Sequence, residues 1–261
     1  MVLLTFDVEE FDIAEEYGQT VDIATKIRVS TEGLLKIVAL LDTYAIKATF
    51  FCTAFFAERQ PELARRLAEQ HELASHGYYH SDFKIEHLRE SREALERIGG
   101  KPVLGYRMAR LAPLDANLVA EAGYLYDSSM NPTWLPGRYN NLNRPRTLHR
   151  VANDKLWLLP TSVTPLLRFP LFWLTLKNLP LTLVSWLSWR TLQHDGYLLL
   201  YYHPWEYCDL SAWKLPYYTR STDGDALLLK MENYIRFFKK RNVEFGTIRD
   251  FLDTIPIRAK D

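Results

Sequence analysis

Short apolar runs, rich in β-branched and aromatic residues, alternate along the chain with longer segments of helical period. This alternation is typical of parallel βα units. The short runs predict strands at Val2–Phe6, Lys47–Thr53, Glu72–Ser75, Val103–Arg107, Tyr124–Ser128, Leu156–Leu159, Tyr197–His203 and Val243–Thr247. Seven or eight such units in 261 residues predict a barrel or a doubly wound sheet, and periodicity does not choose between them.

The clearest helical stripe runs over Thr31–Tyr44, where apolar residues recur three and four positions apart. Ser30 or Thr31 is the expected N-cap, because a side-chain oxygen there accepts from a free N–H of the first turn. Further helices are predicted at Pro61–Gln70, Glu86–Ile98, Asp115–Ala122, Asp225–Lys240 and Arg249–Thr254.

The segment Asn131–Asp195 breaks the rhythm, since it is rich in Pro, Trp and Asn and shows no clear period. It is interpreted as an irregular insertion with partial helix. No internal repeat or long linker divides the chain. We therefore expect a single domain over residues 1–261.

The composition, with 48% hydrophobic and 25% charged residues, is that of an ordinary soluble protein. Basic and acidic residues number 32 each, and this balance argues against nucleic acid as the main partner. Two cysteines, Cys52 and Cys208, are typical of a reducing compartment. The most apolar region, Val163–Trp189, is broken by Arg168 and Lys177, so no membrane-spanning helix is expected. With no signal peptide evident, the expected location is cytoplasmic.

Polar residues follow two of the predicted strands. Asp7, Glu9 and Glu10 end the first, and His76 and His80 follow the third. Two histidines four residues apart with one carboxylate form a catalytic metal set that leaves a position open for water. Taken alone, the two histidines also fit a packing role, and the carboxylates also fit a solvated acidic turn. Their joint occurrence at strand ends favours a metal site.

Polar motifs recur in order at Thr5–Phe11, Ile46–Phe51, His71–His80, Gly105–Arg107, Ala122–Ser129 and His203–Glu206. In this order they resemble the polysaccharide deacetylases with the NodB homology domain, carbohydrate esterase family 4. The Asp-Val-Glu and His-Pro-Trp-Glu forms of the first and fifth motifs are similar to the branch associated with exopolysaccharide gene clusters. The resemblance implies a distorted (β/α)7–8 barrel, single-domain with an aromatic-rich insertion. It also implies metal-dependent removal of N-acetyl groups from an oligo- or polysaccharide.

The resemblance further implies a metal site built on His76 and His80. Val8 stands where the family usually has a metal-binding aspartate. Some members of the family use an Asp-x-acid arrangement instead, so the resemblance implies Glu9 as the third ligand, on the same face of the strand as residue 7, with Glu10 as the other candidate. The implied ion is divalent, first of all Zn²⁺, although Co²⁺, Ni²⁺, Fe²⁺ or Mn²⁺ suit the same donors.

Roles in proton transfer are carried over in the same way. Asp7 is the expected general base toward the attacking water, held by Arg107. His203 is the expected general acid toward the leaving amine, oriented by Asp127. Asp127 also fits an ordinary turn, because Asp-Ser-Ser is common turn chemistry.

Aromatic residues gather at Phe169–Leu174, with Trp186 and Trp189 further on. They are expected to stack on sugar rings or to rest on a membrane interface, while a cover over the core or over an oligomer interface fits equally. Tyr79 and Trp205 are the other expected substrate contacts, and Trp205 also fits a packing residue.

Two alternatives remain open at this level. The same metal chemistry serves an O-acetyl esterase or a non-sugar amidase. Val8 also fits a metal-free saccharide-binding pseudoenzyme. The metal, the exact saccharide and the oligomeric state are not specified by the sequence, and peripheral contact with a membrane stays open.

Overall fold

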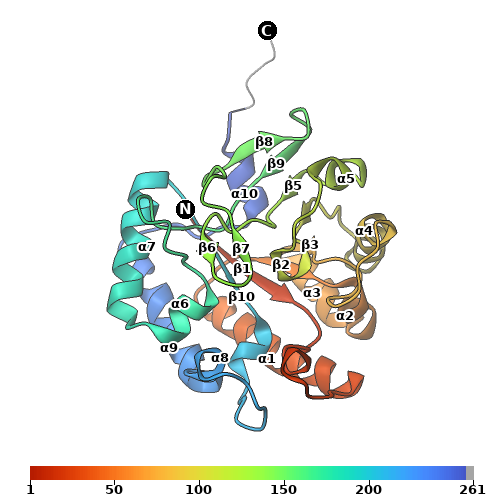
Figure 1. The fold of residues 1–261 in the computed structure, drawn as a ribbon, viewed down its shortest axis with the longest axis horizontal. Helices are drawn as coiled ribbons and strands as arrows, with labels where there is room; N and C mark the ends of the chain where they lie inside the picture. Colours follow the sequence, from red (N-terminus) through yellow and green to blue (C-terminus); the bar gives the residue numbers. More distant parts are fainter. Residues whose placement is uncertain (257–261) are drawn as a thin grey trace.

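The computed structural model describes residues 1–256. One curled eight-stranded sheet, ordered β10-β1-β2-β3-β4-β5-β9-β8, forms a half-barrel (Figure 1). Its strands are β1 Val2–Val8, β2 Thr49–Cys52, β3 Glu72–Ser75, β4 Gly105–Tyr106, β5 Tyr126–Asp127, β8 His149–Val151, β9 Leu156–Leu158 and β10 Leu198–Tyr202. All neighbours pair parallel except β8, which runs antiparallel to β9. The predicted distorted α/β barrel is confirmed.

Helices surround the outer side of the sheet, and a short hairpin lies across one end of it (Figure 1). The hairpin consists of β6 Trp134–Leu135 and β7 Tyr139–Asn140. The helices are α1 Ile23–Thr43, α2 Ala54–Arg59, α3 Pro61–Gln70, α4 Glu86–Gly99, α5 Ala116–Glu121, α6 Trp173–Asn178, α7 Leu181–Asp195, α8 Tyr217–Arg220, α9 Gly224–Lys239 and α10 Ile248–Asp253. Three 3-10 turns complete the fold: η1 Glu15–Tyr17, η2 Ala109–Leu111 and η3 Pro204–Tyr207.

The first helix begins eight residues earlier than the stripe predicts. Its N-cap is Asp22, whose side chain accepts from the Thr25 N–H, so the predicted cap at Ser30 or Thr31 is wrong. Ser30 lies inside the helix and is fully buried. Its hydroxyl donates to the Glu9 carbonyl at 2.6 Å, which ties α1 to the chain just beyond β1.

Hydrogen bonds join the two ends of the half-barrel, one of them from the Leu148 N–H before β8 to the Tyr197 hydroxyl before β10, at 2.9 Å. Just after β9, Ser162 donates its N–H to the Leu199 carbonyl, and its hydroxyl accepts from the Leu199 N–H, both at 2.9 Å. The strand predicted at Val243–Thr247 is wrong, because Phe245 makes only an isolated bridge to Val2. That segment lies beside the first residue of β1, where the Val2 N–H donates to the Glu244 carbonyl and the Val2 carbonyl accepts from the Gly246 N–H, and it forms no strand of the sheet.

The predicted irregular insertion, residues 131–195, holds more regular structure than expected. Besides β9, which matches the strand predicted at Leu156–Leu159, it contains β8, which extends the main sheet, and the fifteen-residue α7. Helix α7 has leucines and tryptophans on several faces, so it lacks the one-sided stripe from which a helix is predicted. Helix α2 was also not predicted, since it directly follows β2 and has only six residues.

Gly33 allows α1 to pack against η3. A Cβ at this position would lie 1.8 Å from the Pro204 carbonyl oxygen. The atoms of Pro204 that this Cβ would meet are backbone atoms, so a rotamer change cannot relieve the clash. We expect Gly33→Ala to lower the free energy of unfolding by about 3 kcal/mol. Urea unfolding measures this, with the exposed Glu32→Ala, expected to cost about 0.5 kcal/mol or less, as control. Equal stability of both variants would show that α1 and η3 are not in this contact.

Candidate active site

The carboxyl ends of the parallel strands meet at one cavity of about 310 Å³. Asp7 reaches it from β1, His76 from the end of β3 and His203 from the end of β10. Ligand sites of parallel α/β folds lie at this end of their strands. The sequence-predicted residues from three strands are therefore brought to one place.

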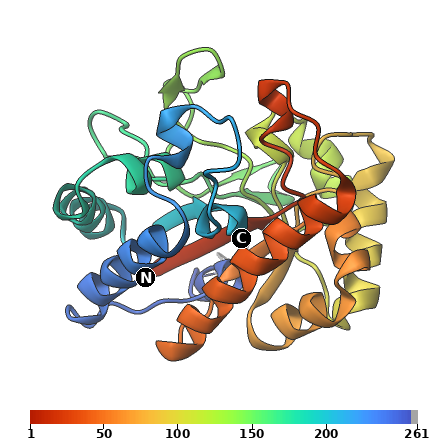
Figure 2. The ribbon, with the colours of Figure 1, turned by 90° about the horizontal axis from the view of Figure 1, so that it is seen from below.

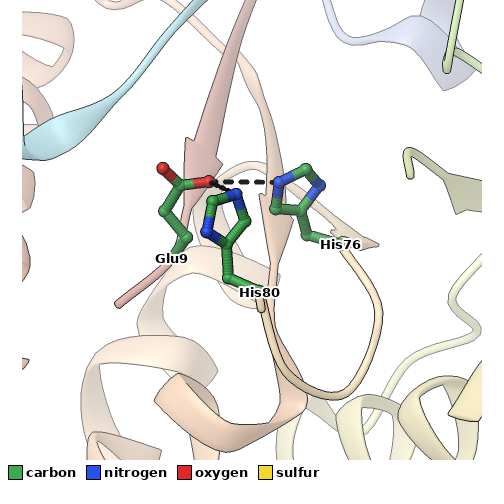
Figure 3. A group of neighbouring side chains, drawn as sticks. All are labelled: Glu9, His76 and His80. Atoms are coloured by element: carbon green, nitrogen blue, oxygen red, sulfur yellow. Dashed lines mark hydrogen bonds and ion pairs between the residues drawn. The ribbon is translucent and has the colours of Figure 1, made fainter. Parts of the chain in front are cut away.

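Glu9, His76 and His80 form a compact triad in the cavity (Figure 3). The Glu9 Oε2 atom lies 3.2 Å from His76 Nε2 and 3.0 Å from His80 Nε2. Ligands held about 2.0–2.1 Å from one metal ion, at tetrahedral to octahedral angles, lie about 3.0–3.4 Å apart. The two distances from Glu9 to the histidines match that requirement, and all three donor atoms lie within 4.8 Å of one another.

The far side of each imidazole is held by another group. His76 Nδ1 lies 2.9 Å from the Arg107 carbonyl, and His80 Nδ1 lies 2.8 Å from Asp12 Oδ2. Outer partners of this kind fix the tautomer that leaves Nε2 free to bind a metal. Gly77, between the two histidines, has φ of +86°, a left-handed conformation that favours glycine and turns the loop back after His76.

The two oxygens of Glu9 have different partners. Oε2 faces the histidines, whereas Oε1 accepts from the indole N–H of Trp205 at 3.0 Å. Glu10 points elsewhere, and its Oε2 accepts from the Thr53 hydroxyl at 2.7 Å. Of the two carboxylates that the sequence left open, Glu9 joins the triad. Trp205, predicted as a substrate contact, lines the cavity but is buried and holds Glu9.

The triad stabilises positive charge. Burial opposes ionisation of Glu9, but the charges of His80 and His203 and hydrogen bonds from both triad histidines hold its pKa well below the usual range. Burial likewise opposes protonation of His80, yet the charge of Glu9 and the hydrogen bonds of Asp12 and Glu9 raise its pKa to about 10. A divalent cation supplies the positive charge that this cluster favours, so the donor set fits a metal ion.

Asp7 is anchored by a buried ion pair. Its Oδ1 accepts from Arg107 Nη1 at 2.6 Å, as predicted for this pair. Arg107 is fully buried and also donates to the Thr5 hydroxyl and to the Ser128 carbonyl and hydroxyl. Among residues 1–256, Asp7 Oδ2 has no hydrogen-bond partner, and the side chain lines the cavity. One oxygen is therefore fixed while the other remains available.

His203 has a different carboxylate partner from the one predicted. Its Nδ1 lies 3.0 Å from Glu206 Oε1, and Glu206 Oε2 lies 3.3 Å from the buried Lys177 ammonium. Burial opposes the charged imidazole, but Glu9 and Glu206 raise the pKa of His203 overall.

Asp127 instead accepts from the N–H and hydroxyl of Ser129, the turn arrangement that its sequence also fits. It does not line the cavity. Burial raises its pKa to about 6. The predicted orientation of His203 by Asp127 is therefore wrong, because the turn after β5 points the carboxylate at its own backbone.

The aromatic residues divide between the cavity and other surfaces. Phe172 and Trp173 line the cavity, and Trp173 packs edge-on against His203 at 5.3 Å between ring centroids. Trp186 is exposed. The predicted substrate contact Tyr79 lies outside the cavity and packs against Phe55 and His87, so that prediction is wrong for this cavity.

Sequence reasoning did not assign Asp12 and Lys177 to the site and gave Glu206 no role. Glu206 lies three residues after His203, a spacing that places both on one side of the 3-10 turn η3. That spacing was a usable signal. No sequence signal points to Asp12 or Lys177, because only the folded chain brings them to His80 and Glu206.

The N-terminal part of the chain matches a known protein family. Residues 1–125 match the family model for polysaccharide deacetylase. This stretch holds Asp7, the Glu9–His76–His80 triad and Arg107. The match and the shared fold support the polysaccharide deacetylase resemblance, without fixing a branch of the family.

Solved structures share the fold over nearly the whole chain. A Mycobacterium smegmatis protein classed as a polysaccharide deacetylase is 20% identical, with a TM-score of 0.64 over 100% of this chain and 93% of that one. PuuE allantoinase is 18% identical, with a TM-score of 0.66 over 98% and 91%. A carbohydrate esterase family 4 pseudoenzyme from Bacillus anthracis is 13% identical, with a TM-score of 0.55 over 98% and 66%. At these identities the likeness shows the fold alone.

Proposed function

We propose that this protein is a metal-dependent hydrolase that removes N-acetyl groups from an N-acetylated oligo- or polysaccharide. The observation that carries the proposal is the convergence of Glu9, His76 and His80 in one cavity with Asp7 and His203. The match of the N-terminal half to the polysaccharide deacetylases supports the choice of a sugar N-acetyl group.

Glu9, His76 and His80 would hold a divalent metal, of which Zn²⁺ suits two imidazoles and a carboxylate best. When bound there, such an ion polarises the acyl carbonyl and lowers the pKa of water. The buried Trp205 N–H and the Asp12 carboxylate keep the ligand atoms aimed at one point.

Proton transfer falls to two further side chains that line the cavity, Asp7 and His203. The free oxygen of Asp7 accepts the proton of the attacking water, while Arg107 holds the carboxylate in place. His203, whose Nδ1 lies 3.0 Å from Glu206 Oε1, donates a proton to the leaving nitrogen. Acetate and the free amine are the products.

A substrate panel tests this proposal. The full-length protein, loaded with Zn²⁺, is assayed for acetate release from chitooligosaccharides, from O-acetylated xylooligosaccharides and for hydrolysis of allantoin. We expect chelator-sensitive release from the chitooligosaccharides. Turnover of only the ester or of allantoin would assign the site to a different acyl substrate, and no turnover of any would favour a saccharide-binding pseudoenzyme.

Glu206 provides a further prediction for the same reaction. We expect Glu206→Gln to lower kcat by about 10²-fold, because the imidazole loses the carboxylate that orients and charges it. Loss of that charge lowers the pKa of His203. Since the acid must be protonated, the alkaline limb of the pH–rate profile should move to lower pH.

The control for this variant concerns Lys177, which Glu206→Gln leaves buried without a counter-charge. Such a loss costs about 3–5 kcal/mol of stability. The double variant Lys177→Met/Glu206→Gln removes both charges and should recover stability but not the rate. Asp127→Asn should leave the pH profile unchanged. A shift with Asp127→Asn but not with Glu206→Gln would restore Asp127 as the partner of His203.

A further inference from the structure

A patch of apolar residues and arginines lies on and next to the β6–β7 hairpin, two of whose residues, Leu135 and Tyr139, line the cavity. It consists of the exposed Trp134, Leu142, Leu166 and Leu167 with Arg144 and Arg168. These residues lie on three segments, 132–134, 140–144 and 164–169. Figure 2 shows the β6–β7 hairpin and the loop before α6 projecting from the same side of the molecule.

Hydrogen bonds join the three segments. The Arg168 guanidinium donates to the carbonyls of Pro132 at 3.3 Å and of Arg144 at 2.8 Å, and the Thr133 hydroxyl donates to the Arg168 carbonyl at 2.6 Å. The loop is closed on itself by the Thr164 N–H bond to the Phe169 carbonyl. These hydrogen bonds hold the loop of residues 164–169 in one conformation, and this loop is called the platform below.

Two leucines stand on this platform almost wholly in solvent. Leu166 is 94% exposed and Leu167 is 87% exposed, the highest values among the large apolar residues of the described chain. A fixed loop that holds two adjacent leucines in water indicates a surface that is covered by a partner.

The charge around the patch identifies that partner. The three segments of the patch, 132–134, 140–144 and 164–169, carry Arg144 and Arg168 and no acidic residue. Arg138 and Arg146 pair with Glu16 and Asp195, whereas within residues 1–256 Arg144 and Arg168 have no carboxylate partner. Exposed leucines beside arginines that have no carboxylate partner match the apolar interior and negative headgroups of an anionic bilayer.

We propose that this patch docks on an anionic lipid surface, with Leu166 and Leu167 inserted among the acyl chains and Arg144 and Arg168 at the headgroups. No helix of the described residues is long and apolar enough to span a bilayer, so the contact is peripheral. Leu135 and Tyr139 of the β6–β7 hairpin line the cavity. Docking therefore holds the cavity mouth close to the bilayer, where a saccharide carried on a lipid is within reach.

Vesicle sedimentation tests the proposal. The full-length protein is spun with phosphatidylglycerol-rich vesicles and with pure phosphatidylcholine vesicles, at low and high salt. We expect it to pellet with the anionic vesicles at low salt only. Leu166→Ser/Leu167→Ser should weaken this binding at least about tenfold. The matched control is Leu35→Ser/Leu229→Ser, two leucines exposed on α1 and α9, and it should bind as the parent does.

Several outcomes would overturn the proposal. A parent protein that stays in the supernatant with anionic vesicles would overturn it, and so would a loop variant that pellets as the parent does. A parent that is dimeric and a loop variant that is monomeric, neither binding vesicles, would assign the patch to a second copy of the chain. Binding needs no turnover, so Glu9→Gln should pellet normally. Deacetylation of a soluble substrate by Leu166→Ser/Leu167→Ser should be unchanged, which separates this proposal from the proposed function.

Discussion

Asp7→Asn is expected to lower kcat by about 10²–10⁴-fold while the protein keeps its full metal content. The amide cannot accept the proton of the attacking water. It occupies the same volume, and Asp7 is not a member of the metal triad. The measurement combines steady-state kinetics with elemental analysis of the same preparation.

Stability is the main confounding effect, because the variant leaves Arg107 buried without its counter-charge at a cost of about 3–5 kcal/mol. Assays are therefore run well below the measured Tm of the variant. Glu10→Gln is the matched control, since Glu10 is a buried neighbour bonded to Thr53 that lies outside the cavity. Full activity of Asp7→Asn would remove Asp7 as the base, and loss of metal would make it a ligand.

Glu9→Gln is expected to have the opposite pattern, with the metal lost first. Changing an outer partner of a ligand already costs about 10–100-fold in metal affinity, so loss of a ligand charge should cost more than about 100-fold. Glutamine keeps an oxygen for the Trp205 N–H, so the packing around the site is retained. Competition with a chromogenic chelator measures the affinity without reference to turnover.

Glu10→Gln again serves as the control and should bind metal as the parent does. If Glu10→Gln lost the metal while Glu9→Gln kept it, the ligand would be the other carboxylate, and the loop after β1 would have to differ from the one described. Unchanged affinity in both variants would exclude a site built on this segment.

The fold was largely predictable because its strands carry a strong local signal. Segments such as Glu72–Ser75 and Pro61–Gln70 match their predicted bounds, since each is apolar or amphipathic at the period of its element. Prediction failed where tertiary contacts override the local pattern. The start of α1 is fixed by the Asp22 cap and by Ser30 reaching Glu9, not by its apolar stripe.

The site residues likewise divide into those that the sequence predicts and those that only tertiary contacts bring to the site. Asp7, Glu9 and His76 follow directly from strand ends, and strand order places them together. The partners that hold these groups could not be predicted as easily. Lys177 comes from α6 and meets Glu206 only because the helix packs against η3, while the turn after β5 takes Asp127 away from His203.

The most direct test of this account is the metal content of the purified full-length protein, with acetate release from chitooligosaccharides assayed in parallel, before and after chelation. The account predicts one divalent ion per chain, acetate release that disappears on chelation, and recovery of both when the metal is restored. Absence of bound metal under metal-replete conditions, or acetate release that survives complete removal of the metal, would contradict it.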